Sequence, residues 1–161
     1  MILTTEGKVL FNETSNIVVK SNEAKNVMSF SRAKIAELSG GNNKNLVFFG
    51  EVNAGKSSSM RNTHHLVYHK ELVLSKATPV VKYDLESNTI SIRSEVFIKN
   101  LFIDLAGGKY IKLSDNYFDV VPGYPVTVKI DGDLKEIKGS LTFKSYRESY
   151  TGEKMDIQLE Q

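Results

Sequence analysis

The chain contains no cysteine, and only 3 of its 161 residues are proline. Without cysteine it forms neither disulfide bonds nor thiolate metal sites, although this absence does not reveal the compartment. No apolar run approaches the ~20 residues that a membrane-spanning helix requires. The first residues, MILTTEGKVLF, lack the charged and apolar regions of a signal peptide.

An excess of charge of either sign is also lacking. The chain has 21 basic and 19 acidic residues, which gives a formal net charge of +2. Because the two signs are interspersed, no strong field favours a nucleic acid or an anionic membrane, and we expect neither as a partner. The composition, 40% apolar and 25% charged, is that of an ordinary globular protein.

Short apolar stretches that alternate with polar residues, separated by turn signals, predict an all-β fold. The length fits two small β-sandwiches, and we place the boundary so that they span residues 1–76 and 77–161. One short helix is expected at Arg32–Leu38 and a further edge strand at Met155–Leu159. The main predicted strands are Ile2–Thr4, Lys8–Phe11, Asn16–Lys20, Asn26–Phe30, Leu46–Phe49, Thr63–Tyr68, Val80–Leu85, Thr89–Ser94, Val96–Leu105, Tyr110–Leu113, Val126–Ile130 and Gly139–Ser145.

The most informative stretch is Ser114–Pro125, with the sequence SDNYFDVVPGYP. Aspartate and asparagine start turns, proline presets φ, and glycine allows a positive φ. We expect Tyr117 and Phe118 to be buried and to pin this corner into a sandwich, as tyrosines do in immunoglobulin-like domains. The residues predicted to form this structural corner are Asp115, Asn116, Tyr117, Phe118, Asp119, Pro122 and Gly123.

Residues Gly50–Ser57 match the phosphate-loop pattern G-x-x-x-x-G-K-[ST], and Asp104–Gly107 resembles the D-x-x-G of a GTPase. In such a site Lys56 would contact phosphate and Ser57 the metal. A phosphate loop must open a helix, however, and the residues after Ser57 show no helical apolar face. We therefore interpret Gly50–Ser59 as a hairpin connection, with a nucleotide binder as a distant alternative.

Two other groups of polar residues suggest sites but are better explained as structural. His64, His65 and His69 could bind a metal, but on a strand His65 and His69 would lie roughly 13 Å apart, so we assign no metal site. Retaining glycoside hydrolysis needs two positioned carboxylates. The available carboxylates occur where strand ends and turns use them, so no catalytic residue and no cofactor are predicted; they are Glu95, Asp104, Asp115 and Asp119.

Aromatic rings could form a platform for sugar, because they present flat faces to pyranose C–H groups. The candidates are Tyr110, Tyr117, Phe118, Tyr124, Tyr146 and Tyr150. More often such residues are core or corner residues. If the chain binds saccharide, we expect the contacts from Tyr124, Tyr146 and Tyr150.

Several stretches resemble the last two domains of β-mannosidases of glycoside hydrolase family 2. Residues 96–103 (VFIKNLFI), 114–119 (SDNYFD) and Pro122-Gly123 are similar to their C-terminal immunoglobulin-like domain. Residues 61–72 (RNTHHLVYHKEL), together with parts of the first 30 residues, resemble the penultimate domain. The stretch 114–123 is the most specific part of the resemblance.

The resemblance implies two consecutive immunoglobulin-like sandwiches, the first incomplete at its N-terminus, from an exo-acting retaining β-mannosidase. The catalytic glutamates of such enzymes lie on a TIM barrel that precedes these domains, so none is carried over here. The implied role is non-catalytic packing against the barrel, other domains or a second subunit. The alternative is a carbohydrate-binding module that binds a β-mannoside saccharide. The resemblance favours a periplasmic or extracellular location.

Overall fold

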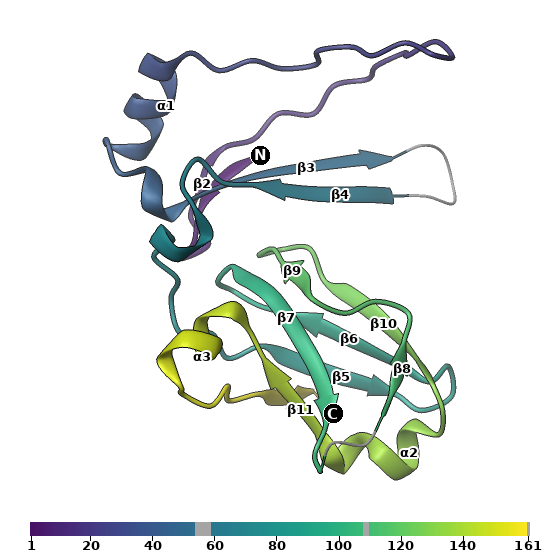
Figure 1. The fold of residues 1–161 in the computed structure, drawn as a ribbon. Helices are drawn as coiled ribbons and strands as arrows, with labels where there is room; N and C mark the ends of the chain where they lie inside the picture. The colour runs from purple at the N-terminus through teal and green to yellow at the C-terminus, as the bar shows by residue number, and fades with distance from the viewer. Residues whose placement is uncertain (54–58, 108–109, 161) are drawn as a thin grey trace. The chain divides into compact units, whose positions relative to one another are not determined.

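The computed structural model describes residues 1–53, 59–107 and 110–160 (Figure 1). The chain divides into two compact units. Unit 1 comprises Met1–Thr4 and Lys8–Leu72, and unit 2 comprises Thr5–Gly7 and Val73–Gln161. Strands dominate both units, so the predicted all-β fold class is confirmed. The units divide after Leu72, whereas the predicted domain boundary followed residue 76.

Unit 1 contains a four-stranded sheet with the order β2-β1-β3-β4. The strands are β1 (Ile2–Thr4), β2 (Val9–Phe11), β3 (Leu46–Asn53) and β4 (Ser59–His64), and all neighbours are antiparallel. The predicted hairpin of β1 and β2 is confirmed. The buried apolar residues of this sheet come from β1 and from the start of β3. They are Ile2, Leu3, Leu46, Val47 and Phe49.

Residues 12–30 form no strand, so the predicted strands Asn16–Lys20 and Asn26–Phe30 are wrong. Val18 is 81% exposed. A β-branched sequence forms a strand only where a neighbouring strand supplies hydrogen bonds and packing, and these residues pair with no strand of the described chain. Phe30, at the end of this segment, packs on the sheet, where its ring contacts those of Phe11 and Phe48 edge to face.

The predicted short helix is present as α1 (Arg32–Ser39). Ser31 caps its first turn by accepting a hydrogen bond from the Lys34 backbone amide. Gly40 ends it in the left-handed conformation with φ 59°. Two single turns of 3-10 helix follow, η1 (Asn43–Asn45) before β3 and η2 (His69–Glu71) after β4. Because β4 ends at His64, the strand predicted at Thr63–Tyr68 is displaced towards the N-terminus.

Unit 2 contains two sheets. The larger has the order β12-β5-β6-β10-β8, and the smaller has the order β11-β7-β9. The strands are β5 (Val80–Asp84), β6 (Thr89–Arg93), β7 (Ile98–Leu105), β8 (Lys112–Leu113), β9 (Phe118–Val120), β10 (Val126–Asp131), β11 (Leu141–Lys144) and β12 (Gln158–Glu160). The pairs are antiparallel except β12 with β5, which is parallel.

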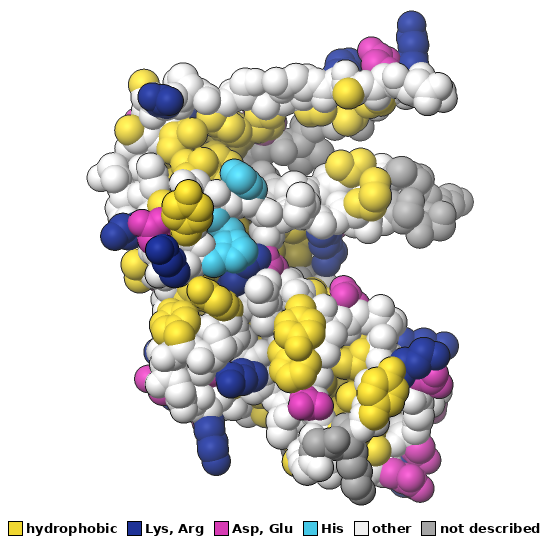
Figure 2. All heavy atoms as spheres, in the orientation of Figure 1, with side chains coloured by type: hydrophobic (Ala, Val, Ile, Leu, Met, Phe, Trp, Pro, Cys, Tyr) yellow, Lys and Arg dark blue, Asp and Glu magenta, His cyan; other side chains and the backbone are white. Residues whose placement is uncertain are grey.

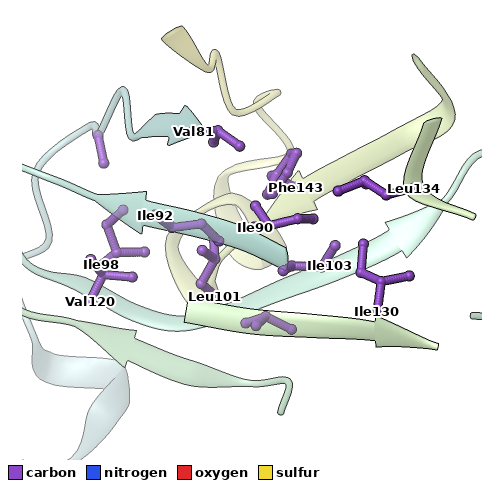
Figure 3. Close-up of a cluster of buried hydrophobic side chains, with 12 residues drawn as sticks. Val81, Ile90, Ile92, Ile98, Leu101, Ile103, Val120, Ile130, Leu134 and Phe143 are labelled. Atoms are coloured by element: carbon purple, nitrogen blue, oxygen red, sulfur yellow. The ribbon is translucent and has the colours of Figure 1, made fainter. Parts of the chain in front are cut away.

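The core of unit 2 lies between these sheets, as the alternating pattern of β6 predicts. Ile90 and Ile92 of β6 and Leu101 and Ile103 of β7 are completely buried and point towards one another (Figure 3). The same cluster includes Ala77, Val81, Ile98, Val120, Val128, Ile130, Leu134 and Phe143. This burial of both inner faces is the packing of a β-sandwich.

Two short helices, α2 (Leu134–Ile137) and α3 (Tyr146–Thr151), were not predicted. Both begin with capping signals. Asp133 accepts from the Lys135 amide, and Ser145 and Glu148 form a capping box at the start of α3. Helices of four and six residues are too short for an apolar period to show in the sequence, so only these caps could have indicated them.

The edge strand β12 carries a carboxylate whose ion pairs attach it to the larger sheet. Glu160 binds Lys82 of β5 and Arg93 of β6, each at 3.4 Å. The hydrogen bond from Lys82, together with the positive charge of Arg93, lowers the pKa of Glu160 below its usual value. Arg147 lowers the pKa of Glu153 in the same way.

These lowered pKa values predict that acid weakens unit 2. A carboxyl group whose pKa is lower when folded stabilises the protein fully above its unfolded pKa, near 4, and loses that contribution as the pH falls through the folded value. We expect the melting temperature to fall between about pH 5 and pH 3. Glu160→Gln should make the fall shallower in thermal melts across this range, and an unchanged slope would contradict the prediction.

Candidate functional site

Asn116 fastens the corner between β8 and β9 to the middle of β7. Its Oδ1 accepts from the Ile103 amide and its Nδ2 donates to the Ile103 carbonyl, both at 2.9 Å. The side-chain amide of Asn116 thus makes the two hydrogen bonds that the backbone of a neighbouring strand would otherwise make to Ile103. At the other side of the corner, Ser114 bonds to Lys129 of β10 through its backbone amide and its hydroxyl. The corner is therefore attached to both sheets of unit 2.

Asp119 forms the second attachment, through an ion pair that is largely removed from solvent. Its carboxylate accepts from Lys99 Nζ at 2.9 Å, and the two side chains are 12% and 10% exposed. It also accepts from the Asn100 backbone amide at 2.8 Å. Asn100 has φ 50° and lies where the register of β7 and β9 shifts. Asp119 thus accepts the hydrogen bond of a backbone amide that the interrupted ladder leaves without a strand partner.

The prediction that Tyr117 is a buried pin is wrong. Tyr117 is 64% exposed, and its ring stacks on Phe102 of β7 with a centroid separation of 4.7 Å and an interplanar angle of 22°. Its backbone has φ 61°, in the left-handed region. Phe118 packs against the core from a partly buried position. Polar side chains, more than aromatic rings, therefore hold the corner.

The corner ends in the turn predicted from Pro122 and Gly123. Val121 and Tyr124 form a bridge across it, and the Tyr124 amide donates to the Val121 carbonyl at 2.9 Å. Gly123 adopts φ 81°, a conformation that favours glycine. At the opposite end, Asp115 is exposed and accepts from the Asn116 amide. The predicted turn chemistry thus matches the observed geometry at both ends of the corner.

The three tyrosines predicted to contact sugar lie on two different elements. Tyr146 and Tyr150 are one turn apart on α3, with their rings edge to face at 5.6 Å, and Tyr150 is 56% exposed. Tyr124 is partly buried in the turn before β10. The structure thus brings two of the three together. Their contact with sugar remains a prediction.

The phosphate-loop interpretation lacks the helix that it needs. Gly50 lies within β3, and Ser59 begins β4, which pairs with β3 from Phe48–His64 to Asn53–Ser59. Lys56 and Ser57 lie outside the described residues. The predicted hairpin is present as the antiparallel pair of β3 and β4, but residues 50–53 of the predicted connection belong to strand β3. Asp104 of the GTPase-like D-x-x-G stretch lies in β7 of unit 2 and accepts from the Leu105 amide.

The histidines are arranged differently from the prediction. The strand ends at His64, so His65 and His69 do not lie on one strand and the predicted separation of roughly 13 Å does not apply. Their rings meet edge to face with centroids 5.9 Å apart. His65 is buried, with Nδ1 3.3 Å from the Leu46 carbonyl oxygen. Within the described residues no group of three or more potential metal ligands occurs.

The candidate carboxylates have separate structural contacts. Asp104 and Asp115 accept from neighbouring backbone amides, and Asp119 accepts from Lys99. Glu95 is exposed. The most deeply buried carboxylate is Glu148, 2% exposed, which closes the capping box of α3 and binds Arg147 at 3.3 Å. Sequence reasoning missed Glu148, although the spacing Ser145-x-x-Glu148 is the signal for it.

A pocket of about 270 Å³ lies in unit 1, between the sheet and the segment that contains Phe30. Its lining is mainly apolar and includes Ile2, Met28 and Phe48, with His64 at one side. It contains no carboxylate. This composition suits the packing of apolar groups better than acid–base chemistry.

No helix among the described residues has the length and apolar character required to cross a membrane. This finding agrees with the absence of a long apolar run from the sequence.

Comparison with known proteins identifies the second unit. Residues 72–149 match the Ig-fold domain family Ig_mannosidase. A search of curated proteins gave no match.

Among solved structures, the crystal structure of β-D-mannosidase from Dictyoglomus thermophilum is similar over 100% of this chain. The TM-score is 0.70 at 18% sequence identity, and the chain spans 18% of that enzyme. At this identity the likeness concerns the fold. Together with the family match, it confirms the predicted resemblance. Residues 72–149 thus match an Ig-fold domain family that is named for mannosidases, and the solved enzyme has the same fold over this region.

Proposed function

We propose that this chain is a non-catalytic accessory region of a β-mannosidase-like glycoside hydrolase. In this proposal residues 77–161 form a C-terminal immunoglobulin-like domain and residues 1–76 form part of the penultimate one. The observation that carries it is the match of residues 72–149 to the Ig_mannosidase domain. The parent enzyme would release β-mannose by retaining exo-hydrolysis in the periplasm or outside the cell, with its catalytic carboxylates elsewhere.

The arrangement of carboxylates supports a non-catalytic role. Asp119 is neutralised by Lys99, and Glu148 is occupied by Ser145 and Arg147. A retaining glycosidase needs one carboxyl group free to protonate the leaving group and another free to attack. The described carboxylates with buried positions have structural contacts instead.

Exposed apolar side chains in unit 1 support a packing role. Val18 is 81% exposed and Met60 is 65% exposed. Others of the same unit are Val9, Ile17, Val19, Val27, Met28 and Val52. So many exposed apolar groups on one small unit are characteristic of a surface that contacts another protein part. We propose the catalytic barrel, or a neighbouring subunit, as that part.

The test compares the whole enzyme with the isolated 161-residue chain. Val18→Lys and Met60→Lys should lower the melting temperature of the whole enzyme by several degrees, because a charge would be buried at the interface. The same variants should leave the isolated chain unchanged, because there both side chains contact solvent.

Tyr110→Lys is the matched control, since Tyr110 is 85% exposed but belongs to unit 2. It should change neither protein. Equal melting temperatures for wild-type and variant whole enzyme would contradict the packing role. Hydrolysis of p-nitrophenyl β-mannoside by the isolated chain would contradict the non-catalytic assignment.

A further inference from the structure

The outer face of the three-stranded sheet carries a row of side chains that the corner completes. Phe102 of β7 pairs with Lys144 of β11 across the ladder. On its other side, Tyr117 stacks on Phe102. Residues that pair across a sheet project from the same face, so Lys144, Phe102 and Tyr117 form one transverse row. Exposed hydrophobic side chains are visible over β7 in Figure 2.

Neither the backbone nor the core explains a tyrosine at position 117. Among the described residues other than glycine, those with positive φ are Asn22, Asn88, Asn100 and Tyr117. Asparagine tolerates this conformation, whereas a bulky side chain is unusual there. Tyr117 is 64% exposed, so its side chain adds little to the core. Asn116 nevertheless fixes its position through two bonds to Ile103. The corner therefore holds an aromatic ring firmly at the surface.

Polar groups of several kinds adjoin the two rings. Asp104 lies two residues from Phe102 and therefore on the same face of β7. Thr142 of β11 pairs with Asp104, next to the pair of Lys144 with Phe102. A carboxylate, a hydroxyl and an ammonium group thus lie on the same face of the sheet as Phe102, and together they supply both acceptors and donors of hydrogen bonds.

We propose that this surface, formed by Phe102, Tyr117, Asp104, Thr142 and Lys144, is a binding site for a pyranoside. One face of the sugar would stack on the exposed face of Tyr117, while its hydroxyls bond to the adjoining polar groups. The proposal concerns a binding activity beyond the structural role proposed above, and does not depend on it. It also places the sugar contacts on residues other than Tyr124, Tyr146 and Tyr150.

The size of the apolar surface favours a sugar over a protein partner. Of the large hydrophobic side chains that are exposed in the described chain, Tyr117 alone lies in or directly beside β7, β9 or β11. A stable protein interface buries about 800 Å² on each partner, far more than one ring offers. A single ring with polar neighbours instead matches the size and mixed polarity of one pyranose unit.

The test titrates the 161-residue chain with methyl β-mannoside, β-1,4-mannotriose and cellotriose, followed by ¹H–¹⁵N NMR. We expect saturable binding with shifts concentrated at Phe102, Tyr117 and Lys144. Tyr117→Gly suits the positive φ and removes the ring, so it should preserve the spectrum of the fold and weaken binding at least about tenfold. Tyr117→Trp keeps an aromatic ring at this position and should therefore bind the saccharide about as tightly as the wild type.

Tyr110→Ala is the control, because Tyr110 is the more exposed of the two rings at 85%. It should leave binding unchanged. Absence of binding at millimolar saccharide would overturn the proposal, and so would equal affinity of the wild type and folded Tyr117→Gly. Binding that depends instead on Tyr124, Tyr146 or Tyr150 would also overturn it. None of these results affects the melting temperatures that test the packing role.

Discussion

Replacing Asp119 by alanine is expected to destabilise unit 2 by about 3–5 kcal/mol, because it leaves a buried lysine without its counter-charge. The Lys99 side chain is 10% exposed, and its Nζ lies 2.9 Å from the Asp119 carboxylate. The change also removes the acceptor for the Asn100 amide at the register shift. Both losses act on the same corner. Urea unfolding followed by circular dichroism and tyrosine fluorescence measures the effect.

The matched control is Asp131→Ala. Asp131 binds Lys112 at 2.8 Å, but both side chains are more than 60% exposed. Solvent screens such a pair, so its loss should change the urea midpoint little. The double variant Lys99→Met, Asp119→Leu removes both charges together and should be more stable than Asp119→Ala. Similar midpoints for Asp119→Ala and Asp131→Ala would show that burial does not determine the strength of the Lys99–Asp119 pair.

Leu101→Ala should cost about 2–5 kcal/mol, through lost apolar burial and the cavity that remains. Leu101 of β7 is completely buried and lies within the cluster between the two sheets (Figure 3). The neighbouring strands are fixed by their ladders, so the sheets can close only part of the space. Urea unfolding measured as above gives the difference.

Two substitutions calibrate this prediction. Leu85→Ala removes the same atoms from a side chain that is 41% exposed, and it should cost much less than Leu101→Ala. Ile92→Val removes one methylene group from the same core and should cost about 1 kcal/mol. If Leu101→Ala and Leu85→Ala are equally stable, the inter-sheet cluster does not supply the main stabilisation of unit 2.

The strands of unit 2 were largely predictable because most of them have a local signature; β9 is the exception, since its residues were predicted as part of the corner. Ile90 and Ile92 alternate with polar residues, so β6 is expected wherever one face is buried. The turn at Pro122 and Gly123 is likewise set by the conformations that these two residues favour. These features depend on a few neighbouring residues, and the structure preserves them.

The segment 12–30 shows where local reasoning fails. Ile17, Val18 and Val19 have the β-branched character of a strand, but they have no partner strand within the described chain. Strand formation requires a second strand that is distant in sequence, and no local pattern reports it. The short helices α2 and α3 were missed by the sequence analysis for a different reason, because a helix of one or two turns has no measurable apolar period.

The sequence by itself determined that the protein is all-β, that it resembles the end of a β-mannosidase, and which residues form the turns and inner faces of unit 2. It also located the corner at residues 114–125. Only the tertiary structure decided how that corner is held: Asn116 binds β7, Asp119 neutralises Lys99, and Tyr117 lies outside on Phe102. Turn propensity and alternation arise from neighbouring residues, whereas the partners of a polar or aromatic side chain come from strands distant in sequence, and only folding brings them together.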